Sequence, residues 1–226
     1  MRDNKLIQAL AGAVSLGSVV VMTITLRGGF PPGVERGPHE AAGWALATQA
    51  LSLLKPGGHI MLIMRDTAEF KNPATDIQLA SFKKELRKTH ASISMVQALQ
   101  VDPLRPMEVP PGDFLEWIRK SPDGSVIVSF MGPPILTDGQ RKQLGEIKPA
   151  IVAFCPGGVP ERVSLHALFD NGLLHTAIVS RRNSTLSATK PRTLQAWFDQ
   201  HFVIVTAANV GDVFASSEIQ SSAESR

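Results

Sequence analysis

Histidines and carboxylates supply much of the acid–base and metal chemistry of proteins, so their spacing in the chain indicates whether such a site is present. The six histidines are spread along the chain and form no HExxH motif or other close ligand pair, which argues against a zinc site. Asp66 and Glu69 follow an expected strand and could act as paired carboxylates. No partner is specified for either of them, so we interpret both as solvated loop charges. Asp170 begins an Asp-Asn-Gly sequence and is interpreted as a turn residue.

The single cysteine, Cys155, follows an apolar run and precedes Pro156. A small buried hydrophobe is a better interpretation than a reactive thiol, because free cysteine is commonly buried and no base can be assigned to it. The Pro-Gly-Gly sequence over 156–158 could cradle a phosphate, but no Gly-Lys-Ser/Thr or GxGxxG motif accompanies it, so we expect a turn. We therefore predict no catalytic residue, no metal and no cofactor, and a protein that is not an enzyme.

Composition and charge describe an ordinary globular protein with many short connections. The chain has 226 residues, of which 43% are hydrophobic, and its net charge is +3. A nucleic-acid-binding protein usually shows a concentrated basic stripe with interleaved aromatic residues, whereas the basic residues here are scattered and tyrosine is absent. These features exclude nucleic acid as the expected partner.

The N-terminal run from Leu6 to Leu26 contains no charged residue. At about 1.5 Å per residue, it is long enough to cross the ~30 Å hydrocarbon core of a bilayer as one helix. A cleaved signal peptide and a buried core helix are the alternatives, but the run ends without a small-x-small cleavage site and has no polar face. Arg2 and Lys5 precede it, which favours a cytoplasmic N-terminus. We predict a single-pass inner-membrane anchor over 1–27 and a soluble domain in the periplasm.

After a Gly/Pro linker over 28–38, helical and strand patterns alternate up to residue 210, and a polar tail is expected over 211–226. The expected helices cover 40–54, 76–88, 111–118, 138–147, 163–169 and 193–200, and the expected strands cover 59–64, 92–101, 125–130, 150–154, 175–179 and 202–206. This alternation predicts an α/β domain over 39–210 with a doubly wound parallel sheet. In such domains ligands bind beyond the carboxyl ends of the strands.

Four stretches of the chain resemble the second lobe of type I periplasmic sugar-binding proteins of the ribose-binding kind. Residues 37–45 and the turn over 57–60 are similar to the family's entry into that lobe. Residues 169–179 are similar to its late turn and strand, and residues 202–210 to its closing strand. The resemblance covers about residues 37–210 and implies a single lobe of the periplasmic-binding-protein kind, a non-enzymatic protein and a ligand site at the carboxyl edge of the sheet.

The chain departs from that family at the positions that the resemblance assigns to ligand binding. Gln78 stands where an arginine is expected, and Phe130 with Met131 where an Asn-Asp pair is expected. Cys155 replaces an expected aspartate, and Ser180 an expected glutamine. The family's first lobe is also expected before residue 37, where only the anchor and the linker stand. Because sugar recognition needs convergent polar groups in a closed cleft, a small-molecule ligand is doubtful.

Two functions of different classes follow. The first is a membrane-anchored, non-catalytic interaction protein, an accessory subunit of a membrane complex on its periplasmic side. In this hypothesis an apolar, proline-rich edge faces the other subunits, and its candidate residues are Met131, Pro133, Pro134, Pro156 and Pro160. The alternative is a solute-binding or sensing module related to the sugar-binding proteins of transporters.

Overall fold

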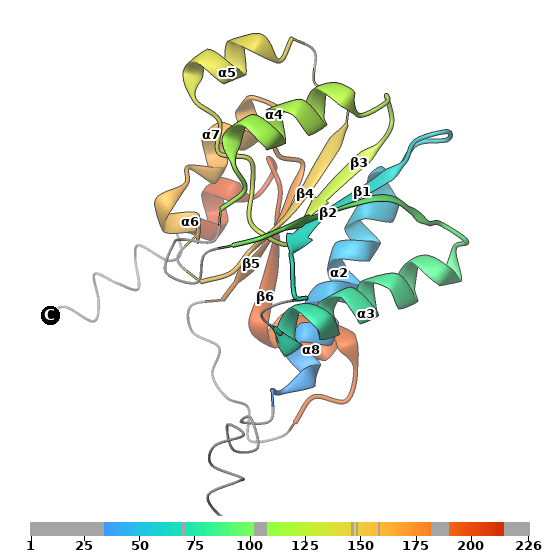
Figure 1. Cartoon of the computed structure of the whole chain (residues 1–226). Helices are drawn as coiled ribbons and strands as arrows, with labels where there is room; N and C mark the ends of the chain where they lie inside the picture. The colour runs from blue at the N-terminus through green and yellow to red at the C-terminus, as the bar shows by residue number, and fades with distance from the viewer. Residues whose placement is uncertain are drawn as a thin grey trace, which may run out of the picture. The chain divides into compact units, whose positions relative to one another are not determined.

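The structure is a computed structural model that describes residues 34–68, 71–101, 108–145, 147, 149–157, 159–181 and 190–214. From Arg36 onward helices and strands alternate (Figure 1). The helices are α2 (Arg36–Leu53), α3 (Pro73–Lys88), α4 (Pro111–Lys120), α5 (Asp138–Gln143), α6 (Val159–Arg162), α7 (Leu165–Asp170) and α8 (Leu194–His201). The strands are β1 (Ile60–Arg65), β2 (Ile93–Leu99), β3 (Val126–Ser129), β4 (Ala150–Cys155), β5 (Thr176–Ser180) and β6 (Phe202–Val205).

The strands form one six-stranded sheet in the order β2-β1-β3-β4-β5-β6. The first five strands of this order run parallel, which confirms the predicted doubly wound α/β domain. The expectation of an entirely parallel sheet is wrong at β6, which pairs antiparallel with β5. No loop separates α8 from β6, so β6 begins where α8 ends, beside the carboxyl end of β5, and can only run back.

Alternating side chains of the strands supply two separate cores, one on each face of the sheet. Ile60, Leu62 and Met64 of β1 join the core that α2, α3 and α8 cover, whereas Met61 and Ile63 join the core beneath α4 and α7. Figure 1 shows α2 and α3 on one face of the sheet and α4 and α7 on the other. Helices on both faces explain why the central strands are apolar at nearly every position.

Short sequence signals set most of the helix boundaries. The Asn72 side chain accepts a hydrogen bond from the Thr75 backbone N–H and caps α3, which therefore begins at Pro73, three residues before the expected start. Thr137 and Gln140 form a reciprocal capping box at α5, which begins at Asp138 as expected. However, α5 ends at Gln143 rather than at Ile147, and α6 was not expected at all.

The described residues contain no helix that is long and apolar enough to cross a membrane. The expected anchor, Leu6–Leu26, and most of the expected linker lie outside the described residues. At the other end, the chain forms a helical turn over 210–214, in which Val210 is buried and Val213 and Phe214 pack against the α4–α7 core. The packed domain therefore extends at least to Phe214, beyond the expected boundary at residue 210.

Helix α2 is held unusually close to its neighbours by small residues. Ala41, Ala42, Ala45 and Ala47 are buried almost completely. At Gly43, an added Cβ would lie only 2.1 Å from the backbone oxygen of Gln78 in α3. The α2–α3 contact therefore depends on a position that has no side chain.

We predict that Gly43→Ala destabilises the domain by about 1–3 kcal/mol, because the new methyl group would force the two helices apart. Helix propensity alone predicts the opposite sign, a gain of roughly 1 kcal/mol. Gly112→Ala is the matched control: it also lies in a helix, with nothing within 4 Å of the added Cβ, and should be neutral or slightly stabilising. Urea unfolding followed by circular dichroism compares the two, and equal stability would contradict the close contact.

Candidate functional site

The carboxyl edge of the sheet is the candidate site, because ligands of doubly wound domains bind there. Strands β1, β3, β4 and β5 all end at this edge. The end of α8 joins them, because the backbone N–H of Arg181, directly after β5, donates to the carbonyl of His201 at 2.8 Å. The Arg181 side chain fixes the same junction through a hydrogen bond from Nε to the carbonyl of Phe202, at 3.0 Å.

The expected ligand positions are mostly filled by side chains of the domain's own cores. Gln78, Phe130 and Cys155 are all buried. Phe130 packs edge-on against Phe82 of α3, with ring centroids 5.7 Å apart. Of these positions only Ser180, at the end of β5, is partly exposed at the edge. The four do not form a polar constellation.

Cys155 is wholly buried at the end of β4, in the core beneath α4 and α7. Its burial raises the pKa of the thiol to about 12. A thiol that stays protonated at neutral pH is a poor nucleophile and a poor metal ligand. The interpretation of Cys155 as a small core hydrophobe therefore agrees with its environment.

The loop after β3 does not form the exposed apolar edge that the sequence suggested. Met131, Pro133 and Pro134 are buried. Phe130 turns to the core under α2 and α3, Met131 turns to the opposite core, and the chain then bends at Gly132, whose φ is +95°. The expectation that these three residues are exposed is wrong: Met131 continues the alternation of the strand into the core beneath α4 and α7, and Pro133 and Pro134 are buried after the bend. Pro156 and Pro160 are partly exposed.

A ring cluster that the sequence analysis did not anticipate lies where α2 begins and α8 ends. Trp197 and His201 stack with centroids 5.6 Å apart, and the Lys190 ammonium lies 5.7 Å above the indole. The first turn of α2 rests on the same indole, since a Cβ on Gly37 would lie 2.2 Å from it. The one available signal was the spacing of Trp197 and His201, four residues apart on an expected helix.

Buried nitrogen atoms without a hydrogen-bond partner mark this edge. Among the described side chains these are His39 Nδ1, Arg65 Nε and His201 Nε2. Arg65 ends β1, and His201 lies beside the end of β5. Burial lowers the pKa of His39, and the charge of His201 lowers it further. Buried donors and acceptors in native proteins usually have a hydrogen-bond partner, protein or water, so these three nitrogens are the polar atoms of this edge at which a partner group can bind.

Asp66 serves the turn after β1. Its Oδ1 accepts a hydrogen bond from the Ala68 backbone N–H at 2.8 Å, while its own N–H donates to the carbonyl of Leu99. Its carboxylate thus has a local structural role, and Glu69 lies outside the described residues. No group of three or more histidine, cysteine or acidic residues is arranged to hold a metal ion in the described part of the chain.

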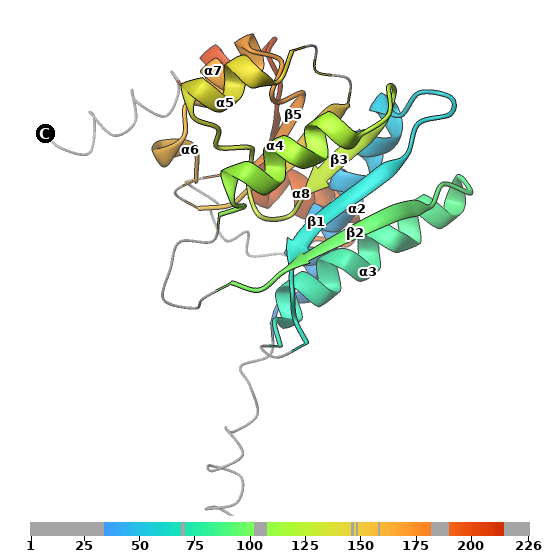
Figure 2. The ribbon, with the colours of Figure 1, turned by 45° about the horizontal axis from the view of Figure 1, so that its top comes forward.

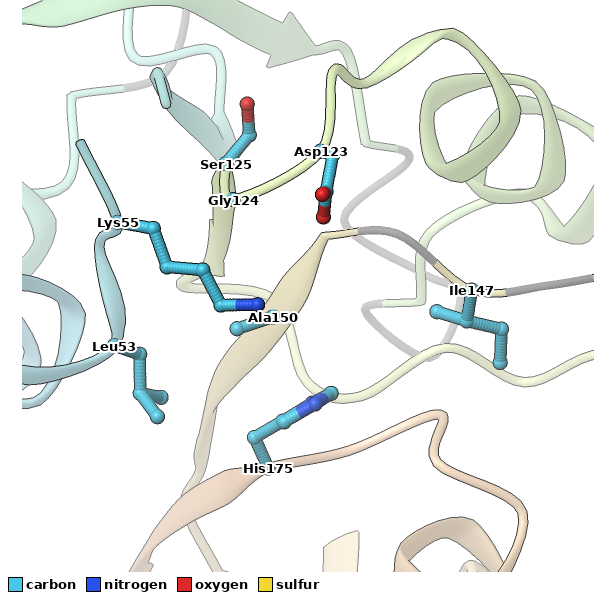
Figure 3. Close-up of a pocket in the computed structure, with 8 residues that line it drawn as sticks. All are labelled: Leu53, Lys55, Asp123, Gly124, Ser125, Ile147, Ala150 and His175. Carbon is cyan, nitrogen blue, oxygen red and sulfur yellow. The ribbon is translucent and has the colours of Figure 1, made fainter. Parts of the chain in front are cut away.

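A pocket of about 620 Å³ lies at the opposite, amino edge of the sheet. In Figure 3 the Lys55 side chain extends toward the space between Asp123 and His175. His175 accepts a hydrogen bond at Nδ1 from the Ile151 backbone N–H at 3.2 Å, and partial desolvation of the ring lowers its pKa. This pocket lies at the end of the sheet where doubly wound domains do not place their ligands.

Comparison with known proteins supports the fold. No protein-family profile matches the sequence, and no curated protein matches it significantly. The structure is similar to a sugar-binding protein of a sugar ABC transporter from Bacillus halodurans, with a TM-score of 0.50 and 14% identity over 76% of this chain and 63% of that chain. An arabinose-binding protein from Geobacillus stearothermophilus has the same TM-score and identity over 77% of this chain and 63% of its own.

These likenesses confirm, at the level of the fold, the resemblance to type I periplasmic sugar-binding proteins. The chain spans about 63% of the length of each of the two proteins. At 14% identity the likeness establishes the architecture and leaves the binding properties to the residues of this chain.

We predict that His39 makes the domain less stable as the pH falls. Its folded-state pKa lies below the ordinary 6.5, so the unfolded chain takes up the proton first. Its stabilising contribution is therefore present above about pH 6.5 and is lost as the pH drops toward the folded-state pKa. Thermal unfolding at a series of pH values should show a smaller drop in Tm for His39→Gln than for the unchanged protein. The matched control is His59→Gln at an exposed site; an equal effect of both substitutions would exclude His39 as the cause.

Proposed function

We propose that this chain is a non-catalytic lobe of the sugar-binding-protein kind that binds another protein through the carboxyl edge of its sheet, and that does not bind free monosaccharides. The observation that carries this proposal is the burial of Gln78, Phe130 and Cys155 inside the domain, the last two in its cores. A sugar site requires polar groups that converge on the ligand. At these positions the chain offers a phenyl ring, a protonated thiol and a buried amide instead.

The spread of the unpaired nitrogens also favours a large partner. Two other strands, β3 and β4, separate β1, which carries Arg65, from β5, beside which His201 lies. Strands are about 4.8 Å apart, so the two groups stand over roughly 14 Å of sheet. One sugar ring does not reach both, whereas a protein surface does.

Solute binding is the second candidate function, and a specific observation favours it. His39 and His201 lie close enough for their charges to interact, and each keeps a buried nitrogen without a partner. Together with Trp197, an aromatic ring of the kind on which ligands stack, they could form a small polar pocket. The sugar-binding proteins with this fold give the alternative its chemical class.

We further propose that Leu6–Leu26 anchors the chain in the inner membrane, with the lobe in the periplasm as an accessory subunit of a membrane complex. The support is the length and apolar character of the run and the basic residues before it. A protein of this fold from Bacillus halodurans is named as part of a sugar ABC transporter, which makes a membrane complex a plausible class of partner.

Titration calorimetry with a panel of pentoses and hexoses tests the proposal that the chain does not bind free monosaccharides. We expect the full chain to show no binding tighter than about 1 mM. A micromolar dissociation constant would establish solute binding instead. In that case His39→Ala and His201→Ala should weaken binding if the sugar occupies the ring cluster, and Arg65→Ala should have little effect.

Fractionation of cells that express the full chain tests the anchor. Carbonate washing should leave the protein in the membrane pellet, and N-terminal sequencing should find the original start, because the run lacks a cleavage site. A variant from which residues 6–26 are deleted is the control and should move to the soluble fraction. Release of the unchanged protein with a new terminus near Arg27 would show that the run is a cleaved signal.

A further inference from the structure

Strand β2 is an exposed, apolar edge of the sheet. It pairs with β1 on one side only, because it stands first in the strand order. Its central residues Met95 and Val96 are 48% and 47% exposed. Among the described residues, Val34 is the one other large hydrophobic side chain with comparable exposure. Two of these three exposed side chains are therefore adjacent at one sheet edge.

The two side chains point to opposite faces of the sheet. Met95 pairs with Met61, which belongs to the core beneath α4, and Val96 pairs with Leu62, which belongs to the core beneath α3. On the α4 side, Met61, Met95 and Trp117 line a groove of about 410 Å³ that is open along β2. On the other side, Figure 2 shows α3 running alongside β2. Apolar surface is thus exposed above and below the same strand.

This edge lacks the usual protections against pairing with another chain. Exposed edge strands normally carry charged residues, especially lysine, or proline. The stretch 91–101 contains no charged residue and no proline. The register shift between β1 and β2 lies at the start of β2, between Ile93 and Met95, and the pairing from Met95 to Leu99 is regular. An exposed edge strand of seven mostly apolar residues tends to associate, so we expect another polypeptide segment to cover β2 in solution.

We infer that a second copy of this chain covers the edge, so that two β2 strands pair antiparallel about a twofold axis near Val96 and the two sheets become continuous. A twofold contact brings the same patch against itself. An uncharged strand meets its copy without repulsion. In this register Val96 faces Val96 of the second copy, and Met95 lies opposite Gln97.

The charges on the neighbouring helix fit this arrangement. Near the N-terminus of α3 lie Asp66, the exposed Lys71 and Asp76, whose Oδ1 accepts a hydrogen bond from the Thr67 hydroxyl at 3.1 Å. The C-terminal half of α3 exposes the basic residues Lys83, Lys84, Arg87 and Lys88. The twofold axis sets the two α3 helices antiparallel on the same face, so Asp76 of each copy lies toward the C-terminal half of the other helix, where the basic residues outnumber Glu85, the partner of Lys88. The helix dipoles then also oppose one another favourably.

Disulfide trapping in the full chain tests the contact and its register. The native Cys155 is buried and should not react, so any covalent dimer comes from the introduced cysteine. Directly opposed residues of antiparallel strands lie about 4.5–5.5 Å apart, within the range for a disulfide. Under mild oxidation Val96→Cys should give a covalent dimer, with less product from Ser94→Cys and Ala98→Cys. The matched control is Ala196→Cys, an exposed residue of α8 next to the other edge of the sheet, which should give no covalent dimer.

A charge at the axis tests the energetics. Val96→Lys replaces an exposed side chain and should leave the fold intact, but it sets two ammonium groups against each other where water is excluded. The dissociation constant of the dimer should rise by on the order of a hundredfold. Light scattering on the detergent-solubilised full chain measures the mass, with Ala196→Lys as the control for added charge.

Two results would overturn the inference. One is cross-linking of positions 94–98 that does not exceed the Ala196→Cys control, or that shows no maximum along the strand, because random collision has no register. The other is an equal mass for the unchanged protein and for a folded Val96→Lys variant. Circular dichroism of Val96→Lys shows that the variant is folded, so a lost dimer cannot be confused with a lost fold. This inference does not depend on the function proposed for the carboxyl edge.

Discussion

The burial of one sheet between two cores is the constraint on which the rest of the structure depends. Each central strand has to supply apolar side chains to both faces, so Ile60, Leu62 and Met64 face one core while Met61 and Ile63 face the other. On one face of the sheet, the small residues of α2 allow this helix to pack closely against α3. This packing leaves few positions at which a polar side chain can serve a site.

The same constraint shapes the carboxyl edge. The resemblance predicts ligand-binding residues at the ends of the strands, but Phe130, Met131 and Cys155 continue the alternation of the strands into the cores. The buried nitrogens without a hydrogen-bond partner lie at the two flanks of this edge, with Arg65 on one side and His39 and His201 on the other. The fold is thus similar to that of sugar-binding proteins, while Phe130, Met131 and Cys155 are packed into the cores.

The sequence predicts most of the architecture, because the strands are short apolar runs and the helices carry clear start signals such as Thr137. The direction of a strand and the exposure of a loop side chain are harder to predict than the positions of the helices and strands. The expected bounds of the last helix (193–200) and strand (202–206) leave no room for a loop, but the alternation of elements does not by itself show that β6 then runs antiparallel to β5. The burial of Met131 depends on how the chain bends at Gly132, and a proline-rich apolar stretch predicts an exposed loop equally well. The cluster of His39 and His201 joins residues that are far apart in the chain, and a single sequence gives no signal for such a meeting.

The two edges of the sheet differ in how they are closed. Strand β6 is short, four residues long, and α8 leads directly into it, so that its start is held by Trp197 and Phe198 beneath. Strand β2 is longer, uncharged and exposed on both faces around Met95 and Val96. A twofold contact at β2 would leave the carboxyl edge of each copy open, since strand pairing extends the sheet sideways, while the carboxyl edge lies at the ends of its strands. Pairing through β2 and polar recognition by His39, Arg65 and His201 are therefore geometrically compatible, and each can be present without the other.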